Sequence, residues 1–237
     1  MSDTVTTQEE LLDLLDALFR KPAPWWDKFY QDRTKDIPFF IDAPDENLVA
    51  YFEEGWLAPG KALELGCGPG RNAIYMAGQG CSVDAIDLSA EAIRWAEERA
   101  ADSGLPVSFR CGDVFEVELE DGAYDLAYDS GLLHHLLPHR RMQYVELLAR
   151  KLKSGGRLGL VCFAPGFEDA GCPGERPDAQ VYRALSMQGG MAYSRERLEL
   201  ILSRHFELID IRHMRDCTDS RELFGKPFLW SSLWGRK

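Results

Sequence analysis

Three glycines at alternate positions follow a short apolar run in the first third of the chain. The stretch from Lys61 to Asn72 reads Lys-Ala-Leu-Glu-Leu-Gly-Cys-Gly-Pro-Gly-Arg-Asn, and an amphipathic segment begins at Ala73. This order predicts a strand, a tight loop and the start of a helix. Glycine is needed where the backbone takes positive φ or lets a ligand approach the main chain, and the free amides of a helix N-terminus favour negative or polar groups. The stretch therefore predicts a site for a nucleotide-like cofactor.

Acidic residues stand at or near the ends of four successive predicted strands: Glu64, Asp87, Asp113 and Asp129. The carboxyl ends of the strands form the edge where open α/β sheets bind ligands. Such a lining would repel a diphosphate and attract a cationic nucleoside. The dinucleotide fingerprint Gly-x-Gly-x-x-Gly also fails, because Arg71 stands where its third glycine should be. The residues therefore favour a cationic nucleoside that carries an amino acid.

The elements that must position these residues alternate between strand and helix, as a doubly wound α/β sheet requires. Strands are predicted at 62–65, 82–87, 107–111, 124–128 and 157–163, and helices at 71–78, 90–103 and 139–153, the last ended by Ser154-Gly155-Gly156. Residues 164–193 show no long period and predict a long loop, which in a compact domain is usually functional or disordered. A helix at 194–205 and strands at 207–214 and 228–234 complete the predicted order.

The first 59 residues predict a helical and aromatic cap ahead of one core domain of residues 60–237. Residues 7–20 form an amphipathic helix with Thr7 as its N-cap, and Lys21-Pro22 ends it. This helix either packs on the core or on a partner subunit, as in a homodimer, or forms a mobile cover over a pocket. Trp25, Trp26 and Tyr30 follow it, and such aromatic rings either join the core or face a positively charged group.

Several stretches together resemble a class I S-adenosylmethionine-dependent methyltransferase. They are the glycine loop, Asp87, Asp113, the Tyr124-Asp125-Leu126 strand and Leu152-Lys153-Ser154-Gly155-Gly156. The similar region runs from residue 62 to about residue 163, and residues 194–237 resemble the antiparallel end of that sheet. The resemblance implies a Rossmann-like, mostly parallel sheet of seven strands with an antiparallel last strand, and S-adenosyl-L-methionine as the cofactor.

The resemblance also implies the contacts of the cofactor. The loop would approach its methionine and ribose portions, Asp87 would take the ribose hydroxyls, Asp113 would accept from the adenine amino group, and Val114 would stack beside the ring. Alternatively, Asp87 begins a helix and Asp113 makes a turn. The implied set of cofactor-binding residues, in which Glu64 has only a supporting part, is Glu64, Gly66, Cys67, Gly68, Gly70, Asp87, Leu88, Asp113, Val114 and Asp129.

The segment Asp129-Ser130-Gly131-Leu132-Leu133-His134-His135-Leu136 resembles small-molecule methyltransferases, including the thiol, thiopurine and tellurite-resistance groups. In these groups it lies between the methyl donor and the acceptor. His134 and His135 are the candidate catalytic bases, since a base helps to deprotonate a hydroxyl, thiol or ammonium acceptor. Alternatively, His135 only caps or packs beneath the next helix. The residues predicted to bind the acceptor are Trp26, Tyr30, Ser130 and Phe167.

The composition narrows the function further. A net charge of −12 without clustered Lys and Arg argues against nucleic acid as a partner. The six cysteines show no Cys-x-x-Cys pair, so no metal site is expected. The N-terminus lacks the features of a signal peptide and no apolar stretch approaches roughly 20 residues, so a cytoplasmic protein is expected. A non-catalytic S-adenosylmethionine-binding protein and an NAD-dependent oxidoreductase remain as alternatives, and the sequence does not identify the acceptor or its reacting atom.

Overall fold

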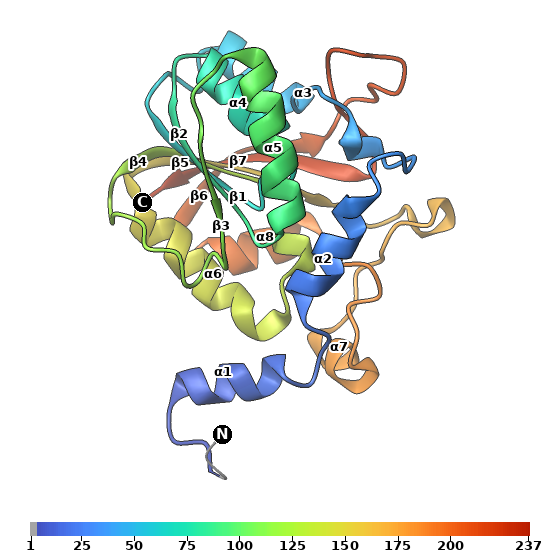
Figure 1. Cartoon of the computed structure of the whole chain (residues 1–237). Coiled ribbons are helices and arrows are strands. Elements are labelled where there is room, and N and C mark those ends of the chain that lie inside the picture. The colour runs from blue at the N-terminus through green and yellow to red at the C-terminus, as the bar shows by residue number, and fades with distance from the viewer. Residues whose placement is uncertain (1–3) are drawn as a thin grey trace.

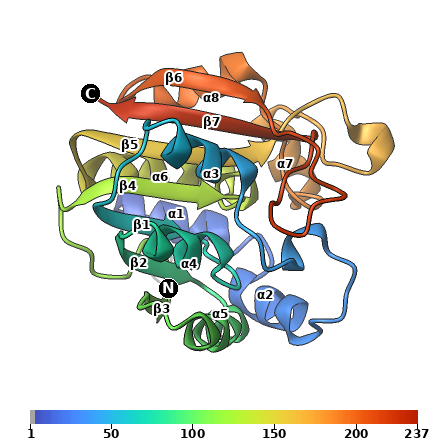
Figure 2. The same ribbon diagram turned by 90° about the horizontal axis from the view of Figure 1, so that it is seen from above.

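The computed structural model describes residues 4–237, which contain one seven-stranded sheet (Figures 1 and 2). Its strand order is β3-β2-β1-β4-β5-β7-β6. The strands are β1 Lys61–Leu65, β2 Ser82–Asp87, β3 Ser108–Cys111, β4 Tyr124–Ser130, β5 Leu152–Phe163, β6 Phe206–His213 and β7 Leu229–Arg236. Strand β7 is antiparallel to both of its neighbours, and the others run parallel to one another. The predicted Rossmann-like sheet with an antiparallel last strand is confirmed.

Helices cover both faces of this sheet. The α-helices of the described residues are α1 Gln8–Asp16, α2 Pro22–Gln31, α3 Glu46–Glu53, α4 Arg71–Gly78, α5 Ala90–Ser103, α6 Pro138–Lys151, α7 Asp178–Ala184 and α8 Arg195–Leu202. Helices α3, α4 and α5 bury Leu48, Met76 and Ile93 on one face, whereas α6 and α8 bury Leu148 and Leu202 on the other. In Figure 1, α3 and α4 lie above the sheet, α6 lies below it, and α1 lies beneath α6. Burial of each such side chain stabilises the fold by about 1.5–3 kcal/mol.

The register of the central strands brings the candidate residues to one edge. Glu64 of β1 pairs with Ala85 of β2 on one side and with Tyr128 of β4 on the other, all in parallel register. The glycine loop after β1 therefore lies between the carboxyl ends of β2 and β4. The chain order reverses at β1, so this is the switch point at which open α/β sheets bind ligands.

The structure corrects one predicted helix end. Helix α6 ends at Lys151 and β5 begins at Leu152, so Ser154-Gly155-Gly156 lies within a strand and does not end the helix. The partners of β5 on β4 shift between Leu152 and Arg157, and the intervening residues form an irregularity in which Gly155 has a φ of 73°. The glycine pair accommodates this extra length of strand.

Three further boundaries differ in the segments outside the central sheet. Helix α1 ends at Asp16, before the predicted end at residue 20. Pro22 stands at the first turn of α2 and starts this helix, where its fixed φ suits the N-terminus. The segment 164–193, predicted as an irregular loop, contains α7. The division into a cap of residues 1–59 and a core domain of residues 60–237 stays a prediction.

Candidate active site

The loop after β1 takes a backbone conformation that requires glycine. Gly66, Gly68 and Gly70 have φ angles of 71°, 51° and 78°. A Cβ atom at Gly66 would lie 2.9 Å from the Cβ of Leu132, and one at Gly68 would lie 3.0 Å from the Tyr30 hydroxyl oxygen. The loop therefore lies in close contact with the segment after β4 on one side and with α2 on the other.

Asp87, at the end of β2, joins this loop to the start of α5. Its Oδ2 accepts the Gly68 N–H at 2.8 Å and its Oδ1 accepts the Ser89 N–H at 2.9 Å. Burial raises the pKa of Asp87 to about 6, although both amide donors favour the carboxylate. Cys67 lies between two of the glycines, and burial raises the pKa of its thiol well above the usual value, so it is a packing residue. Leu88 follows Asp87 and is partly buried.

Behind the loop, a buried charge network occupies the space between β1 and α3. Burial raises the pKa of Glu64 to about 8, and its Oε2 has no hydrogen-bond partner among residues 4–237. Arg71 pairs with Asp45 at 2.6 Å and donates to the Ser130 hydroxyl at 3.2 Å. Arg71, which stands where the dinucleotide motif requires a glycine, therefore holds Ser130 at the end of β4.

Asp113 and Val114 follow β3 on the neighbouring side of the edge. Asp87 is in register with Cys111, so both aspartates are placed at the ends of adjacent strands. Val114 is buried, whereas Asp113 is exposed and its Oδ1 accepts the Phe115 N–H at 3.0 Å. This turn leaves the second carboxylate oxygen of Asp113 free of protein hydrogen bonds within the described chain.

Asp129 differs from the other strand-end acids. It is fully buried, and its two oxygens accept the N–H groups of Leu132 and Leu133, at 2.7 and 3.0 Å, and the Tyr144 hydroxyl at 2.8 Å. Burial raises its pKa to about 6 against these three donors. These hydrogen bonds hold the turn that leads to His134. They favour a structural role for Asp129 over the predicted direct contact with the cofactor.

The two histidines lie in an aromatic wall that joins α2 to the end of β5. The His135 ring meets the Trp26 ring edge-on at 5.0 Å, and the His134 ring stacks on Phe163 at 4.0 Å. Trp26 in turn stacks with Tyr30, the residue above Gly68, at 5.9 Å between ring centroids. The structure thus brings together Trp26, Tyr30 and the histidine pair beside the glycine loop.

Two residues of this arrangement were not predicted. Phe163 was assigned only to a strand, yet it supports His134. Asp27 of α2 accepts a hydrogen bond from the Ser89 hydroxyl at 2.7 Å and so fastens α2 to the start of α5. A single aspartate among aromatic residues could have marked Asp27 as a candidate. Its hydrogen-bond partner could not be predicted, because Ser89 is 62 positions away in the sequence.

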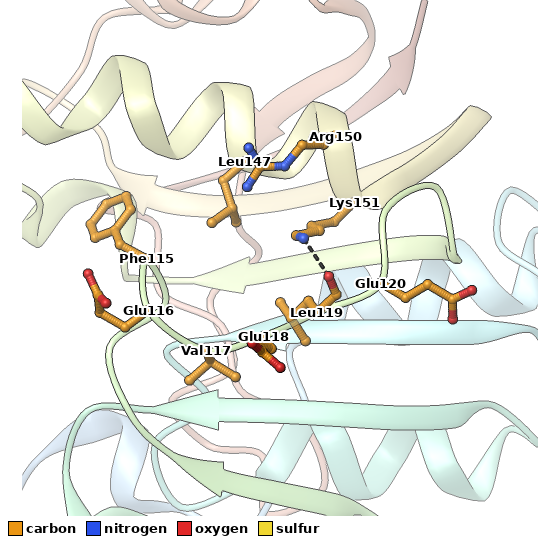
Figure 3. A pocket seen from close by; sticks show the side chains of 9 residues that line it. All are labelled: Phe115, Glu116, Val117, Glu118, Leu119, Glu120, Leu147, Arg150 and Lys151. Atoms are coloured by element: carbon orange, nitrogen blue, oxygen red, sulfur yellow. Dashed lines mark hydrogen bonds between the residues drawn. The ribbon is translucent and has the colours of Figure 1, made fainter.

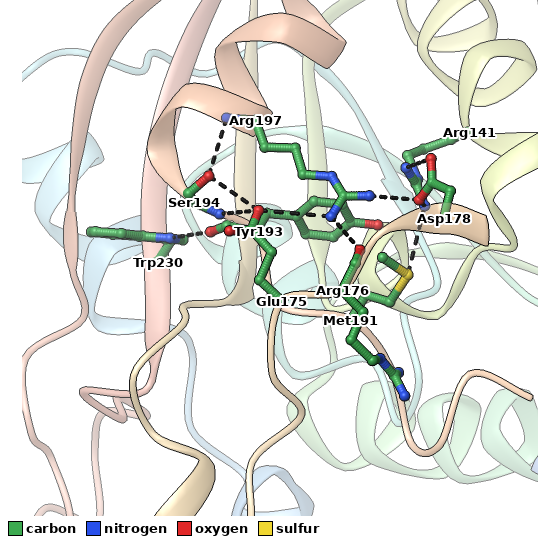
Figure 4. A network of polar contacts seen from close by, with 9 residues as sticks. All are labelled: Arg141, Glu175, Arg176, Asp178, Met191, Tyr193, Ser194, Arg197 and Trp230. Atoms are coloured by element: carbon green, nitrogen blue, oxygen red, sulfur yellow. Dashed lines mark hydrogen bonds and ion pairs between the residues drawn. The ribbon is translucent and has the colours of Figure 1, made fainter. Parts of the chain in front are cut away.

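Phe167, predicted to bind the acceptor, makes no ring contact with Trp26 or with the histidine pair in the described structure. Its ring packs edge-on against His213 of β6 at 5.6 Å. The rest of segment 164–193 is held by the polar network of Figure 4, in which Asp178 accepts from Arg141 of α6 at 3.1 Å and from Arg197 of α8 at 2.5 Å. Met191, in the same segment, donates its N–H to the His134 carbonyl at 2.9 Å.

A separate cavity of about 540 Å³ lies between α6 and the loop that follows β3 (Figure 3). Leu119, Leu147 and Lys151 line it, and the Lys151 ammonium donates to the Leu119 carbonyl at 2.5 Å. None of the predicted site residues is among its lining residues.

The comparisons with known proteins decide the family. A methyltransferase domain model matches residues 62–156. Thiopurine S-methyltransferase from Pseudomonas entomophila is 32% identical over 188 residues, which cover 70% of this chain and 83% of that protein. The chain belongs to the S-adenosylmethionine-dependent methyltransferases.

Other curated relatives and a solved structure are also similar to this methyltransferase. The 2-heptyl-1-hydroxyquinolin-4(1H)-one methyltransferase from Mycobacteroides abscessus is 27% identical over 156 residues, which span 65% of this chain and 66% of that protein. Several further curated relatives match over only 37–53% of their own length. Magnesium protoporphyrin IX methyltransferase from Synechocystis, solved with bound S-adenosylhomocysteine, shares the fold with a TM-score of 0.62 and 17% identity, over 90% of this chain and 92% of that one.

The residues at the switch point fit S-adenosylmethionine, the cofactor of this methyltransferase family. The three positive-φ glycines leave no Cβ between the loop and a ligand. The buried Oε2 of Glu64 has no hydrogen-bond partner in the described chain, so a polar group of a ligand bound at the loop could supply one. Within residues 4–237, no group of three or more His, Cys, Asp and Glu side chains is arranged to hold a metal, and no helix is long and apolar enough to cross a membrane.

Proposed function

We propose that this methyltransferase transfers the methyl group of S-adenosylmethionine to a small-molecule acceptor held between α2 and the end of β5. The observation that carries this proposal is the aromatic wall of Trp26, His135 and Phe163, which adjoins the glycine loop. Flat, largely apolar walls with few polar groups are typical of small-molecule sites. The net charge of −12 disfavours nucleic acid as the acceptor.

The bound cofactor would supply an activated methyl group on a sulfonium. Gly66, Gly68 and Asp87 would hold its amino-acid and ribose portions, while Asp113 and Val114 would hold the adenine. The protein then has to align the acceptor and exclude water, since the donor is already activated. Tyr30 and Trp26 cover the loop and the histidine pair for this purpose.

The acceptor segment after β4 would complete the site. The Ser130 hydroxyl, fixed by Arg71, and one of the two histidines would contact the acceptor. Phe167 packs on His213, away from this aromatic wall, so it would contact only an acceptor that reaches beyond the wall. This assignment follows the resemblance, which implies that the segment from Asp129 to Leu136 lies between the methyl donor and the acceptor.

The test uses the purified full-length chain. Calorimetry with S-adenosylmethionine and with NADH measures cofactor choice, and release of S-adenosylhomocysteine measures turnover with thiols, thiopurines, hydroxyquinolones, phenols and tellurite. We expect binding of S-adenosylmethionine and turnover with at least one small acceptor. Binding without turnover for every acceptor class would favour the non-catalytic alternative, and preference for NADH would overturn the proposal.

A further inference from the structure

His134 is fixed by the protein on several sides. It is 5% exposed, and its ring stacks on Phe163. Its backbone carbonyl accepts the Met191 N–H, and its Nδ1 lies 3.2 Å from the backbone nitrogen of Phe163. The turn that carries both histidines is thus tied to the end of β5 and to segment 164–193.

The contact with Phe163 determines which nitrogen of His134 carries the proton. A backbone N–H can only donate, so Nδ1 of His134 is the acceptor. Burial, with a smaller effect of His135, lowers the pKa of His134 well below its usual value, so the ring is neutral near pH 7. Its single proton therefore resides on Nε2, and neither nitrogen has a free lone pair to receive another proton.

His135 has the opposite character. It is only partly buried, and its ring has no hydrogen bond to any residue in the described part of the chain. It meets Trp26 of α2 and the His134 ring, 5.0 and 4.4 Å away between centroids. Burial and the charge of Arg20 lower the pKa of His135 to about 4, so one ring nitrogen keeps a free lone pair at neutral pH. Arg20 and His134 are the charged and titratable groups that act on it.

We propose that the histidine pair is divided in function: His135 is the catalytic residue that receives the proton of the methyl acceptor, and His134 is a positioning residue. His134 acts through its Nδ1 bond to the Phe163 N–H, which holds the turn so that the His135 ring stays against Trp26. The proposal rests on the methyl transfer proposed above. It assigns different chemistry to two neighbouring residues of the same type.

The step balances with the groups named. The X–H bond of the acceptor breaks and its proton passes to a ring nitrogen of His135. The electron pair left on X forms the bond to the transferred methyl carbon, and the pair of the broken C–S bond stays on sulfur. The imidazolium of His135 then releases its proton to water. Proton transfer to a base with so low a pKa is uphill, so this base favours the most acidic acceptor groups, such as a thiol with a pKa of about 8.5, over less acidic ones.

The first measurement reads the tautomers directly and needs no acceptor. In protein labelled with ¹⁵N-histidine, two-bond ¹H–¹⁵N correlation spectra assign the two rings through the variants His134→Asn and His135→Gln. We expect His134 as the Nε2–H form from pH 5 to 9, and a neutral His135 at pH 7. A proton on Nδ1 of His134, or a protonated His134 at pH 7, would overturn the proposal.

The second measurement separates the roles by turnover. His135→Gln should lower kcat by about 10²–10⁴-fold, the usual contribution of a general base, with cofactor affinity unchanged. His134→Ala should lower kcat by about 10-fold through misplacement of His135, and His134→Asn, whose Oδ1 can accept the Phe163 N–H, should restore most of it. Equal losses in His134→Ala and His134→Asn, or near-normal kcat in His135→Gln, would contradict the division. If no acceptor is turned over by the unaltered protein, the proposed function fails, while the spectra still decide the tautomer.

Discussion

Asp87 is a buried carboxyl whose ionisation should control cofactor affinity. Its pKa of about 6 lies above the usual range because burial disfavours the charged form. Ribose hydroxyls donate to a carboxylate, so binding should require the ionised form. We expect affinity for S-adenosylmethionine to be constant above about pH 7 and to fall up to about tenfold per unit as pH drops below 6. Titration calorimetry from pH 5 to 8 measures this.

The variant Asp87→Asn provides the control for that pH dependence. It should bind the cofactor about 10–100-fold more weakly at pH 7.5, because a charge-assisted hydrogen bond to the ribose is lost. Its affinity should then change little between pH 5 and 8, because the titrating group is gone. An unaltered pH slope in Asp87→Asn would assign the titration to another group.

Gly68 allows a matched test of the loop. An alanine at this position would have to adopt a φ of 51°, and its Cβ would lie only 3.0 Å from the Tyr30 hydroxyl oxygen. Gly122 has a similar φ of 61°, but nothing lies within 4 Å of a Cβ built on it. Both alanine variants should lose about 1–2 kcal/mol of stability from the left-handed backbone. Only Gly68→Ala should also weaken cofactor binding by calorimetry, and an equal effect of Gly122→Ala would refute a direct part for the loop.

At the scale of single residues, the sequence was informative where a type and a spacing depend on local geometry. The alternate glycines and Asp87 follow from the strand–loop–helix geometry and lie as predicted at one sheet edge. Asp129 has the same position at a strand end, but the fate of its carboxylate depends on Tyr144, a helix residue 15 positions away. The roles of His134 and His135 likewise depend on Phe163, which no local pattern connects to them.

The proposed acceptor site depends most on helix α2. Trp26 touches His135, and Asp27 fastens the helix to α5. Replacing Trp26 with Ala should raise KM for the acceptor by about tenfold, since a truncated aromatic anchor commonly costs over 1 kcal/mol, and should leave cofactor affinity nearly unchanged. Steady-state kinetics measure both. Trp56→Ala, which removes a half-exposed ring stacked on Tyr51, is the matched control and should leave KM unchanged.

Segment 164–193 is held at its middle by a carboxylate shared between two arginines. Asp178→Asn would leave Arg141, which is 5% exposed, without its counter-charge. We expect faster trypsin cleavage after Arg183 in this variant, together with a higher KM for the acceptor. Asp169→Asn changes an exposed carboxylate of the same segment and should have neither effect. Equal cleavage rates in the two variants would exclude Asp178 as the anchor of the segment.

Across the whole molecule, the central sheet could be predicted and the cover over it could not. Most of the strands from β1 to β5 carry apolar residues of their own and end at a loop signal, so the local sequence was sufficient to predict them. Helix α2 begins at prolines that equally suit the end of the preceding helix, and α7 has only seven residues, too few to show a period. Their positions are fixed by contacts with α5, α6 and α8, which depend on tertiary structure.

The attachment of the two N-terminal helices leads to a test by truncation. Helix α1 is held to α6 largely by Glu9, Asp13 and Asp16, whose partly exposed carboxylates pair with the buried Arg140. Ion pairs with one partner open to water contribute about 0–1 kcal/mol each. Removing residues 1–21 should therefore leave Tm and cofactor affinity close to those of the full chain. Removing residues 1–31 also takes away α2, with the Tyr30 that covers Gly68 and the Asp27 that binds Ser89.

The longer truncation should weaken cofactor binding at least tenfold and abolish methyl transfer, because water then reaches the donor and the acceptor loses one wall. Thermal unfolding with and without S-adenosylmethionine measures the first effect, since a ligand raises Tm only in the form that binds it. If both truncated chains retained full affinity and turnover, α2 would be no lid. If the shorter truncation already abolished cofactor binding and methyl transfer, the role of the lid would belong to α1 and its contact with Arg140.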